Sequence, residues 1–292
     1  MRLYKKEQLK RLGHWVGYDH LVYLIRLVRK QYRKSIGSFS LATIEETIAE
    51  LLNTERSFTR FGDGEFGAMF LGGGFGFQKR DERLNERLKE VLASRDPNLM
   101  IGLVNVFGLR PMPSLRTRIG EVRREMKLLL DAKQQYYKAS VTRISSRKHF
   151  EQFKKIWEGR NVVTIEGSMC RLGVGNDLFD NVGSLRRILA PAECAFSAYD
   201  RILEEALKIE KDALFLIALG PTATILAYDL CKAGYRALDI GHLDICYELF
   251  LRNEPHMVAI EGKYVNEASY RCPAPCTDPT YLSQIITEVK LN

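Results

Sequence analysis

The sequence lacks any long apolar run: its 292 residues contain no stretch of 18 consecutive apolar residues. A membrane-spanning helix, which needs about 20 such residues, is therefore not expected. The N-terminus also lacks an apolar segment followed by a small-residue cleavage site, which indicates no secretory signal. We expect a cytoplasmic protein with an ordinary packed core, since 46% of the residues are hydrophobic and 27% are charged.

Clusters of metal-binding cysteines are absent as well. The six cysteines are scattered, and only Cys272 and Cys276 in "CPAPC" lie close together. A structural zinc site needs a second such pair, which the sequence does not supply. We expect reduced thiols, with a disulfide or a metal at 272–276 as the minor alternative.

Excess basic charge is missing outside the N-terminus. Residues 1–36 carry ten Lys/Arg and two acidic residues, and the other 34 basic residues face 34 acidic ones. This balance argues against a nucleic-acid-binding face on the main domain. Apolar residues at helical spacing (Leu21, Leu24, Ile25 and Val28) predict a basic amphipathic helical arm over residues 1–37. Such an arm can dock on an anionic membrane surface as a peripheral anchor, or pack on the domain or on a partner subunit of an oligomer.

Residues 38–270 read as one α/β domain, followed by a C-terminal tail at 271–292. Ser40 is the expected N-cap of a helix that runs to about Asn53, and "SFTRFG" predicts a short strand after it. Residues 114–139 predict one long charged helix. From residue 161 onward, apolar strands alternate with helices, which is typical of a mostly parallel sheet flanked by helices.

The stretch "FTRFGDGEFGAMF" ends one predicted strand with two carboxylates. In an extended chain, Asp63 and Glu65 would project to the same side, where like charges repel unless a cation or a proton lies between them. This spacing predicts a site for Mg²⁺ or Mn²⁺, with Gly62 allowing a ligand to approach closely. The alternative is a solvated turn whose carboxylates cap a helix that starts near Phe66.

Other polar loops follow predicted strands, at the edge where open parallel sheets bind ligands. The loop 166–181 is rich in glycine but lacks the Walker A Lys-Ser/Thr and the G-x-G-x-x-G pattern. Loop amides with an arginine, and a Gly-Pro helix start, suit a phosphate, although ordinary turns and caps have the same composition. The candidate donor-binding residues are Arg60, Gly62, Asp63, Arg171, Gly175, Asn176, Asp177, Gly220, Pro221, Thr222, Asp239 and Lys263.

Three side chains are candidates for acid–base work on a substrate hydroxyl: Glu65, His242 and Asp244. "LDIGHLDI" brings His242 and Asp244 to the end of one predicted strand, and "EGKYVNE" brings Lys263 and Glu267 within reach of the same cleft. A lone histidine is more often structural, so its role stays open at this point.

The motifs "RFGDGE", "RLGVGNDLFDN", "ALGPTATILAYDL" and "LDIGHLDI", in this order, resemble a bacterial family of glycosyltransferases with the GT-D fold, once listed as a domain of unknown function. The resemblance runs from about residue 40 to about residue 268. It implies a Rossmann-like α/β domain that binds a nucleotide-sugar, typically UDP-linked, with a D-x-E motif (Asp63–Glu65) for the metal and the donor diphosphate.

We therefore expect sugar transfer, assisted by Mn²⁺ or Mg²⁺, from a UDP-sugar to a glycan or lipid-linked acceptor in surface polysaccharide or glycoprotein synthesis. The alternatives are a metal-dependent phosphohydrolase or another nucleotide-binding enzyme on the same sheet, and a non-catalytic module that docks on a membrane.

Overall fold

The computed structural model of the protein describes residues 39–71, 76–104, 119–144, 146–268 and 273–291. The predicted basic arm and Cys272 lie outside these ranges. Within them, no helix combines the length and the apolar character that a membrane span requires.

Nine strands in the described ranges form one sheet in which every pairing is parallel. The order across the sheet is β1-β4-β3-β2-β8-β7-β5-β6-β9. The predicted parallel α/β architecture is therefore confirmed. The strands are β1 (Ser40–Leu41), β2 (Ser57–Phe61), β3 (Leu99–Leu103), β4 (Gln135–Lys138), β5 (Asn161–Gly167), β6 (Ser184–Ala190), β7 (Leu214–Ala218), β8 (Arg236–Asp239) and β9 (Ile285–Glu288).

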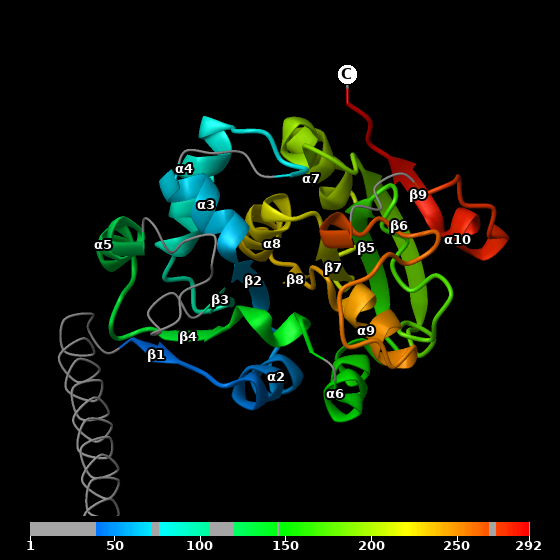
Figure 1. Ribbon diagram of the computed structural model, residues 1–292, viewed down its shortest axis with the longest axis horizontal. Helices are drawn as coiled ribbons and strands as arrows, with labels where there is room; N and C mark the ends of the chain where they lie inside the picture. Colours follow the sequence, from blue (N-terminus) through cyan, green and yellow to red (C-terminus); the bar gives the residue numbers. More distant parts are fainter. Residues whose placement is uncertain (1–38, 72–75, 105–118, 145, 269–272, 292) are drawn as a thin grey trace, which may run out of the picture.

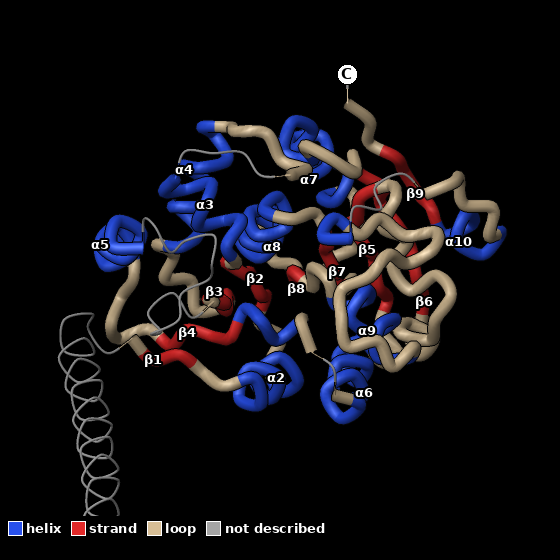
Figure 2. Tube along the Cα trace, viewed as in Figure 1, coloured by secondary structure: helices blue, strands red, loops and turns tan. Residues whose placement is uncertain are grey.

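Helices cover both faces of the sheet (Figures 1 and 2). One face carries α3 (Asp63–Leu71), α4 (Glu82–Leu92), α5 (Ile119–Leu129), α7 (Tyr199–Leu207) and α8 (Pro221–Lys232). The other face carries α2 (Ile44–Asn53), α6 (Arg147–Trp157) and α9 (Leu243–Leu251). The short elements are α10 (Pro279–Gln284) and the 3₁₀ turns η2 (Ala139–Thr142), η3 (Ala195–Ala198) and η4 (Asn266–Ala268).

Each face has its own hydrophobic core. The core under α3, α4 and α8 includes Phe66, Leu84 and Ile225, and the core under α2, α6 and α9 includes Ile48 and Trp157. Central strands such as β7 are buried along their whole length because helices cover them on both sides. The carboxyl ends of the strands thereby lie at one edge of a sheet that is covered on both faces.

The first predicted helix begins later than expected, since α2 starts at Ile44 and its N-cap is Thr43. Thr43 and Glu46 form a reciprocal capping box, in which each side chain accepts a hydrogen bond from the backbone of the other. Ser40 is unavailable as a cap because it pairs with Gln135 of β4 as part of an extended strand. The prediction of Ser40 as the N-cap was wrong for this reason.

The long helix predicted at 114–139 is also wrong in its second half. Helix α5 ends at Leu129, and the chain turns at Asp131, whose side chain accepts the amide hydrogen of Lys133 at 2.8 Å. Residues 135–138 then form β4, with the Tyr136 ring fully buried. Charged residues are equally frequent on surface helices and in turns, so composition alone did not show this boundary.

The segment assigned to a C-terminal tail contributes to the sheet. Its strand β9 pairs in parallel with β6 at the sheet edge, and α10 lies beside both. Helix α6 has no counterpart among the predicted elements. Its apolar residues Phe150, Phe153, Ile156 and Trp157 form part of the core on that face of the sheet.

Candidate active site

A cavity of about 720 Å³ lies along the carboxyl ends of the strands, from β4 to β6. Its lining differs between the two ends. Towards β4, β2 and β8 it is polar, with Arg60, Asp63, Glu65, Ser140, Arg143, His242 and Glu267. Towards β7, β5 and β6 it is mostly apolar, with Phe77, Leu172, Pro191, Ala192, Ala195, Ala218 and Leu219.

Asp63 and Glu65 both line this cavity, but the strand geometry expected for them is wrong. Strand β2 ends at Phe61 and helix α3 already begins at Asp63, so the two side chains leave a helical turn in different directions. Asp63 is exposed, whereas Glu65 folds back and its Oε2 accepts the amide hydrogen of Gly62 at 2.7 Å. Glu65 thus has the capping contact that the alternative interpretation predicted.

The Glu65 carboxyl is electrostatically unusual. Burial, together with the nearby negative charge of Asp239, raises the pKa of Glu65 from its ordinary value to about 7. Backbone hydrogen bonds and the Arg60 charge oppose this rise. Near neutral pH, Glu65 can therefore hold or release a proton, or exchange that proton for a metal ion.

Arg60 reaches the cavity and also joins three segments of the fold. Its Nε donates to the Asp239 carbonyl at 2.9 Å, its Nη2 to the Asp239 carboxylate at 2.8 Å, and its Nη1 to Thr142 Oγ1 at 2.6 Å. Asp239 is buried beneath it, and burial raises the pKa of this carboxyl despite the Arg60 charge. Asp239 lies outside the cavity lining, but it holds Arg60 and its charge acts on Glu65.

His242, Glu267 and Arg143 meet at the polar end of the cavity, from three separate segments. His242 is the N-cap residue of α9, Arg143 follows η2, and Glu267 lies in η4. Glu267 contacts both partners, with its Oε2 3.0 Å from His242 Nε2 and its Oε1 accepting from Arg143 Nη2 at 2.8 Å.

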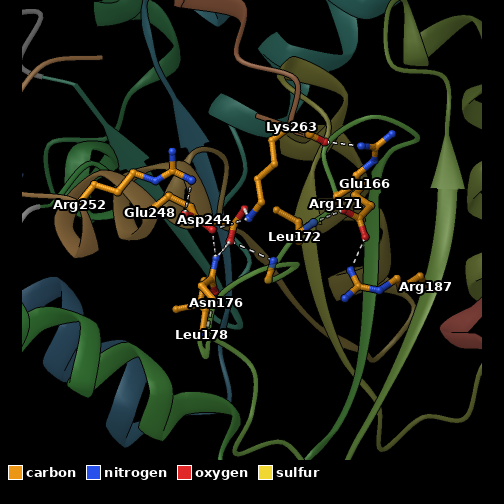
Figure 3. Close-up of polar contacts among 12 residues, drawn as sticks. Glu166, Arg171, Leu172, Asn176, Leu178, Arg187, Asp244, Glu248, Arg252 and Lys263 are labelled. Carbon is orange, nitrogen blue, oxygen red and sulfur yellow. Dashed lines mark hydrogen bonds and ion pairs between the residues drawn. The ribbon is translucent and has the colours of Figure 1, made fainter. Parts of the chain in front are cut away.

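Asp244 borders the cavity, but its carboxylate is fully engaged. It accepts from Lys263 Nζ at 2.7 Å, from the Gly173 amide at 2.9 Å and from Asn176 Nδ2 at 2.9 Å. Figure 3 shows Lys263 and Asn176 converging on Asp244 and Glu248. Because it already accepts three hydrogen bonds and its charge is paired with Lys263, Asp244 is a poor base for a substrate hydroxyl.

The candidate residues of the glycine-rich loop do not line the cavity. Arg171 donates to the Gly262 and Ala274 carbonyls, and Asp177 pairs with Lys154 on the exposed side. Gly175, Asn176 and Lys263 also lie outside the lining. Buried carboxylates hold the loop from beneath, since Glu166, paired with Arg187, accepts the Leu172 amide at 2.6 Å (Figure 3). The loop meets the cavity through Gly167, Cys170 and Leu172 instead.

The start of α8 forms the centre of the cavity floor through Gly220 and Pro221. Gly220 has φ +55°, and a Cβ there would lie 2.5 Å from the Phe77 ring, so only glycine allows this ring to cover the helix start. Thr222 is fully buried and lies outside the lining.

Cys170 also lines the cavity, where burial and the Glu166 charge raise the pKa of its thiol to about 12. The thiol is therefore protonated at neutral pH and is not a nucleophile.

In the described part of the chain, no group of three or more His, Cys, Asp or Glu side chains is arranged to hold a metal. Asp63 and Glu65 can supply at most two carboxylates. This set fits a hard cation such as Mg²⁺ or Mn²⁺ that takes its other ligands from water and from a diphosphate, which is the usual way such ions bind with nucleotides.

Sequence reasoning missed Arg143 and Phe77. Arg143 follows a segment that the sequence predicted as helix, and Phe77 follows a glycine-rich stretch without a motif. The sequence predicts Glu267 within reach of the cleft but assigns it no catalytic or binding role.

Comparison with known proteins gives consistent results. Residues 58–268 match the family described as "Glycosyltransferase GT-D fold". The chain is 32% identical to "Probable glycosyl transferase Gly" of Streptococcus gordonii over 86% of its own length and 39% of that protein. It is 30% identical to "Glycosyltransferase GlyD" of Streptococcus pneumoniae serotype 4 over 99% of its own length and 36% of that protein. The chain thus spans well under half the length of these two relatives.

Two solved structures are similar over most of the chain. One is described as the highly conserved domain of unknown function 1792 with a distinct glycosyltransferase fold, with a TM-score of 0.78 and 28% identity over 89% of this chain and 99% of that one. The other is a new glycosyltransferase from Streptococcus sanguinis, with a TM-score of 0.77 and 31% identity over 86% of this chain and 100% of that one.

Proposed function

The chain belongs to the family of glycosyltransferases with the GT-D fold, and from this premise we propose that it transfers a sugar from a UDP-linked donor to a hydroxyl of a glycan or lipid-linked acceptor. The observation that carries the proposal is the two-ended cavity at the carboxyl edge of the sheet. A nucleotide-sugar has matching parts, namely a planar base, an anionic diphosphate and a sugar rich in hydroxyls. Its acceptor brings further hydroxyls.

The polarity of the lining supports one orientation of the donor. The base would lie at the apolar end, beside Phe77 and Pro191, where a planar ring loses little hydration. The diphosphate would lie close to Asp63 and Arg60 at the polar end. The sugar would then point towards His242, where the acceptor hydroxyl would enter.

Asp63 and Glu65 would hold the Mn²⁺ or Mg²⁺ ion together with the diphosphate. When bound, the ion supplies positive charge to the leaving diphosphate. Asp63 is exposed at the cavity, whereas Glu65 would keep Oε1 for the ion and Oε2 for the Gly62 amide. Arg60 and Arg143 add positive charge to the same end of the cavity.

Among the three candidate bases, His242 fits best. Asp244 is paired with Lys263, and Glu65 is committed to the helix cap and the ion. His242 lines the polar end and has a carboxylate partner, Glu267, which is the arrangement that orients a histidine in acid–base catalysis.

The test is a transfer assay with a panel of UDP-sugars, with and without Mn²⁺, on simple glycan acceptors. Asp63→Ala should reduce turnover by about 100-fold or more, because charge on the leaving group would go unbalanced. The matched control is Asp212→Ala, which removes an exposed carboxylate next to β7 at the opposite edge of the sheet. Unchanged turnover in Asp63→Ala would contradict the role proposed for this residue. Phosphate release from simple esters without transfer would instead favour a phosphohydrolase.

The basic residues 1–36 would bring the enzyme to an anionic membrane that carries lipid-linked acceptors. A variant lacking residues 1–36 should lose salt-sensitive binding to vesicles with anionic lipid and keep its activity on a soluble acceptor. Equal vesicle binding with and without these residues would exclude this role.

A further inference from the structure

Glu267 contacts both His242 and Arg143 at the polar end of the cavity. A carboxylate can only accept hydrogen bonds and a guanidinium can only donate them. His242 has Glu267 on its Nε2 side, at 3.0 Å, and Arg143 Nη2 on its Nδ1 side, at 3.4 Å. A neutral His242 must therefore carry its hydrogen on the nitrogen that faces Glu267, which leaves the other nitrogen as an acceptor.

The same conclusion holds if the imidazole ring is turned over, because the two partners, and not the ring names, decide which nitrogen is protonated. The contact to Arg143 is longer than a usual hydrogen bond, so a ligand hydroxyl in the cavity can compete with Arg143 for the lone pair of that nitrogen.

The segment that carries Glu267 is firmly held. Lys263, buried within it, donates to Asp244 at 2.7 Å and to Glu248 at 3.2 Å, both on α9. The Tyr264 amide donates to the Met169 carbonyl at 2.9 Å, and the Arg171 guanidinium donates to the Gly262 carbonyl. Lys263 and Glu267 thus bind the start of α9 at two points, and His242 is the N-cap residue of that helix.

Glu267 also keeps its negative charge. Partial burial alone would raise its pKa, but the hydrogen bonds and charges of His242 and Arg143 hold the pKa of this carboxyl well below its usual range. Glu267 therefore stays anionic at every pH at which an enzyme of this kind would work. It can stabilise an imidazolium that forms beside it.

We propose that Glu267 is a positioning residue for the transfer reaction, which holds His242 in one tautomer so that its free ring nitrogen takes the proton of the acceptor hydroxyl. This inference rests on the proposed function. In the step, the acceptor oxygen forms a bond to the anomeric carbon as the bond to the diphosphate oxygen breaks. The diphosphate leaves with that electron pair, and the hydroxyl proton passes to His242, next to Glu267.

The first test does not depend on activity. Nitrogen chemical shifts of ¹⁵N-labelled histidine, with the His242 signals identified by their loss in His242→Gln, report which ring nitrogen is protonated. We expect a single tautomer in the unaltered protein, with the hydrogen on the nitrogen that faces Glu267 (Nε2 in this structure), and a mixture of tautomers in Glu267→Ala. A mixture already present in the unaltered protein would overturn the inference, as would a single unchanged tautomer in Glu267→Ala. A fixed tautomer in a protein that transfers no sugar would instead contradict the proposed function.

The second test is the pH profile of kcat. The charged groups that face His242 are Glu267, Arg143 and Asp239 at the end of β8. Glu267→Gln keeps the shape of the side chain but removes its charge, so the acidic limb of the profile should move down by about one pH unit. Glu267→Ala should lower kcat by about 10-fold or more and leave the KM for the donor nearly unchanged.

The matched control is Glu261→Gln, which removes an exposed carboxylate from the same segment. It should leave the acidic limb in place. Thermal unfolding of each variant shows whether it is folded. If Glu267→Ala is not folded, Glu267→Gln alone provides the test. If the acidic limb does not move in folded Glu267→Gln, Glu267 has a structural role only, and the inference is overturned.

Discussion

Arg60 of β2, which lines the cavity, binds Asp239 of β8 twice, once at the backbone carbonyl and once at the carboxylate. This pair joins two neighbouring strands at their carboxyl ends, and it lies between the D-x-E carboxylates and His242. The backbone after β8 leaves room for the Arg60 guanidinium at Gly241. Gly241 has φ +45°, and a Cβ at this position would lie 1.8 Å from Arg60 Nη2.

Gly241→Ala should therefore displace the Arg60 guanidinium. The expected loss of folding free energy is about 2 kcal/mol more than in Gly234→Ala, measured by urea unfolding. Gly234 is the matched control because it also has positive φ, +84°, but open space where a Cβ would be. Equal destabilisation of the two variants would show that backbone strain alone is responsible and that Arg60 does not depend on Gly241.

The raised pKa of Glu65, about 7, predicts how the stability of the protein changes with pH. Between pH 4.5, the ordinary value, and pH 7, the folded state holds a proton on Glu65 that the unfolded state has lost. This group therefore favours folding at low pH, and its contribution is lost as the pH rises to 7. Above pH 7 no further change is expected from it.

Glu65→Gln keeps a hydrogen-bond acceptor for the Gly62 amide and carries no charge. In buffer with a metal chelator, we expect it to be more stable than the unaltered protein at pH 8, by the order of 2 kcal/mol, and of similar stability at pH 5. Urea unfolding at both pH values measures this. A constant difference between the two proteins across the range would argue that Glu65 has an ordinary pKa.

The metal should bind together with the nucleotide. The described residues offer no cluster of three ligands, so Mn²⁺ alone should bind weakly and UDP should tighten its binding by about 10-fold or more. Calorimetry of Mn²⁺ binding with and without UDP measures the coupling, and Asp63→Asn should abolish it. Tight binding of Mn²⁺ to the protein without nucleotide would require a ligand set other than Asp63 and Glu65.

Lys263 should be essential for stability although it does not line the cavity. Its ammonium is buried between Asp244 and Glu248, and Lys263→Met would leave the buried Asp244 carboxylate without a cation and Glu248 with Arg252 alone. We expect a loss of about 3 kcal/mol in urea unfolding. Lys208→Met is the control, because Lys208 is exposed and its ion pairs lie at the surface, so its loss should cost much less than the loss of Lys263. Similar losses in both variants would contradict the role of Lys263 as a buried clamp.

Much of the fold could be predicted from the sequence because its signals are local. Apolar runs such as residues 214–218 are read directly as buried parallel strands, and Gly220–Pro221 marks the following helix start. The errors arose where local signals were ambiguous. Ser40 has the composition of a cap, but it is extended because it pairs with Gln135, which is 95 residues away.

The site shows the same division. Asp63, Glu65 and His242 were chosen for their chemistry and their place after predicted strands, and all three line the cavity. Arg171, Asn176 and Lys263 were chosen on equal grounds but form buried contacts beneath the loop. Nothing in the neighbouring sequence distinguishes these cases, because burial depends on other segments. The partners of Asn176 and Arg171 lie 68 and 103 residues away, and those of Lys263 lie 15 and 19 residues away on α9.

The sequence by itself determined the parallel α/β sheet, the D-x-E carboxylates and the edge at which ligands would bind. Strand pattern and strand-end position are properties of short segments, and short segments can be read one at a time. Only the tertiary structure decided that α3 begins at Asp63, that Glu65 caps it, and that Glu267 and Arg143 face His242. Each of these depends on packing and charge between distant segments, and a linear pattern does not contain that information.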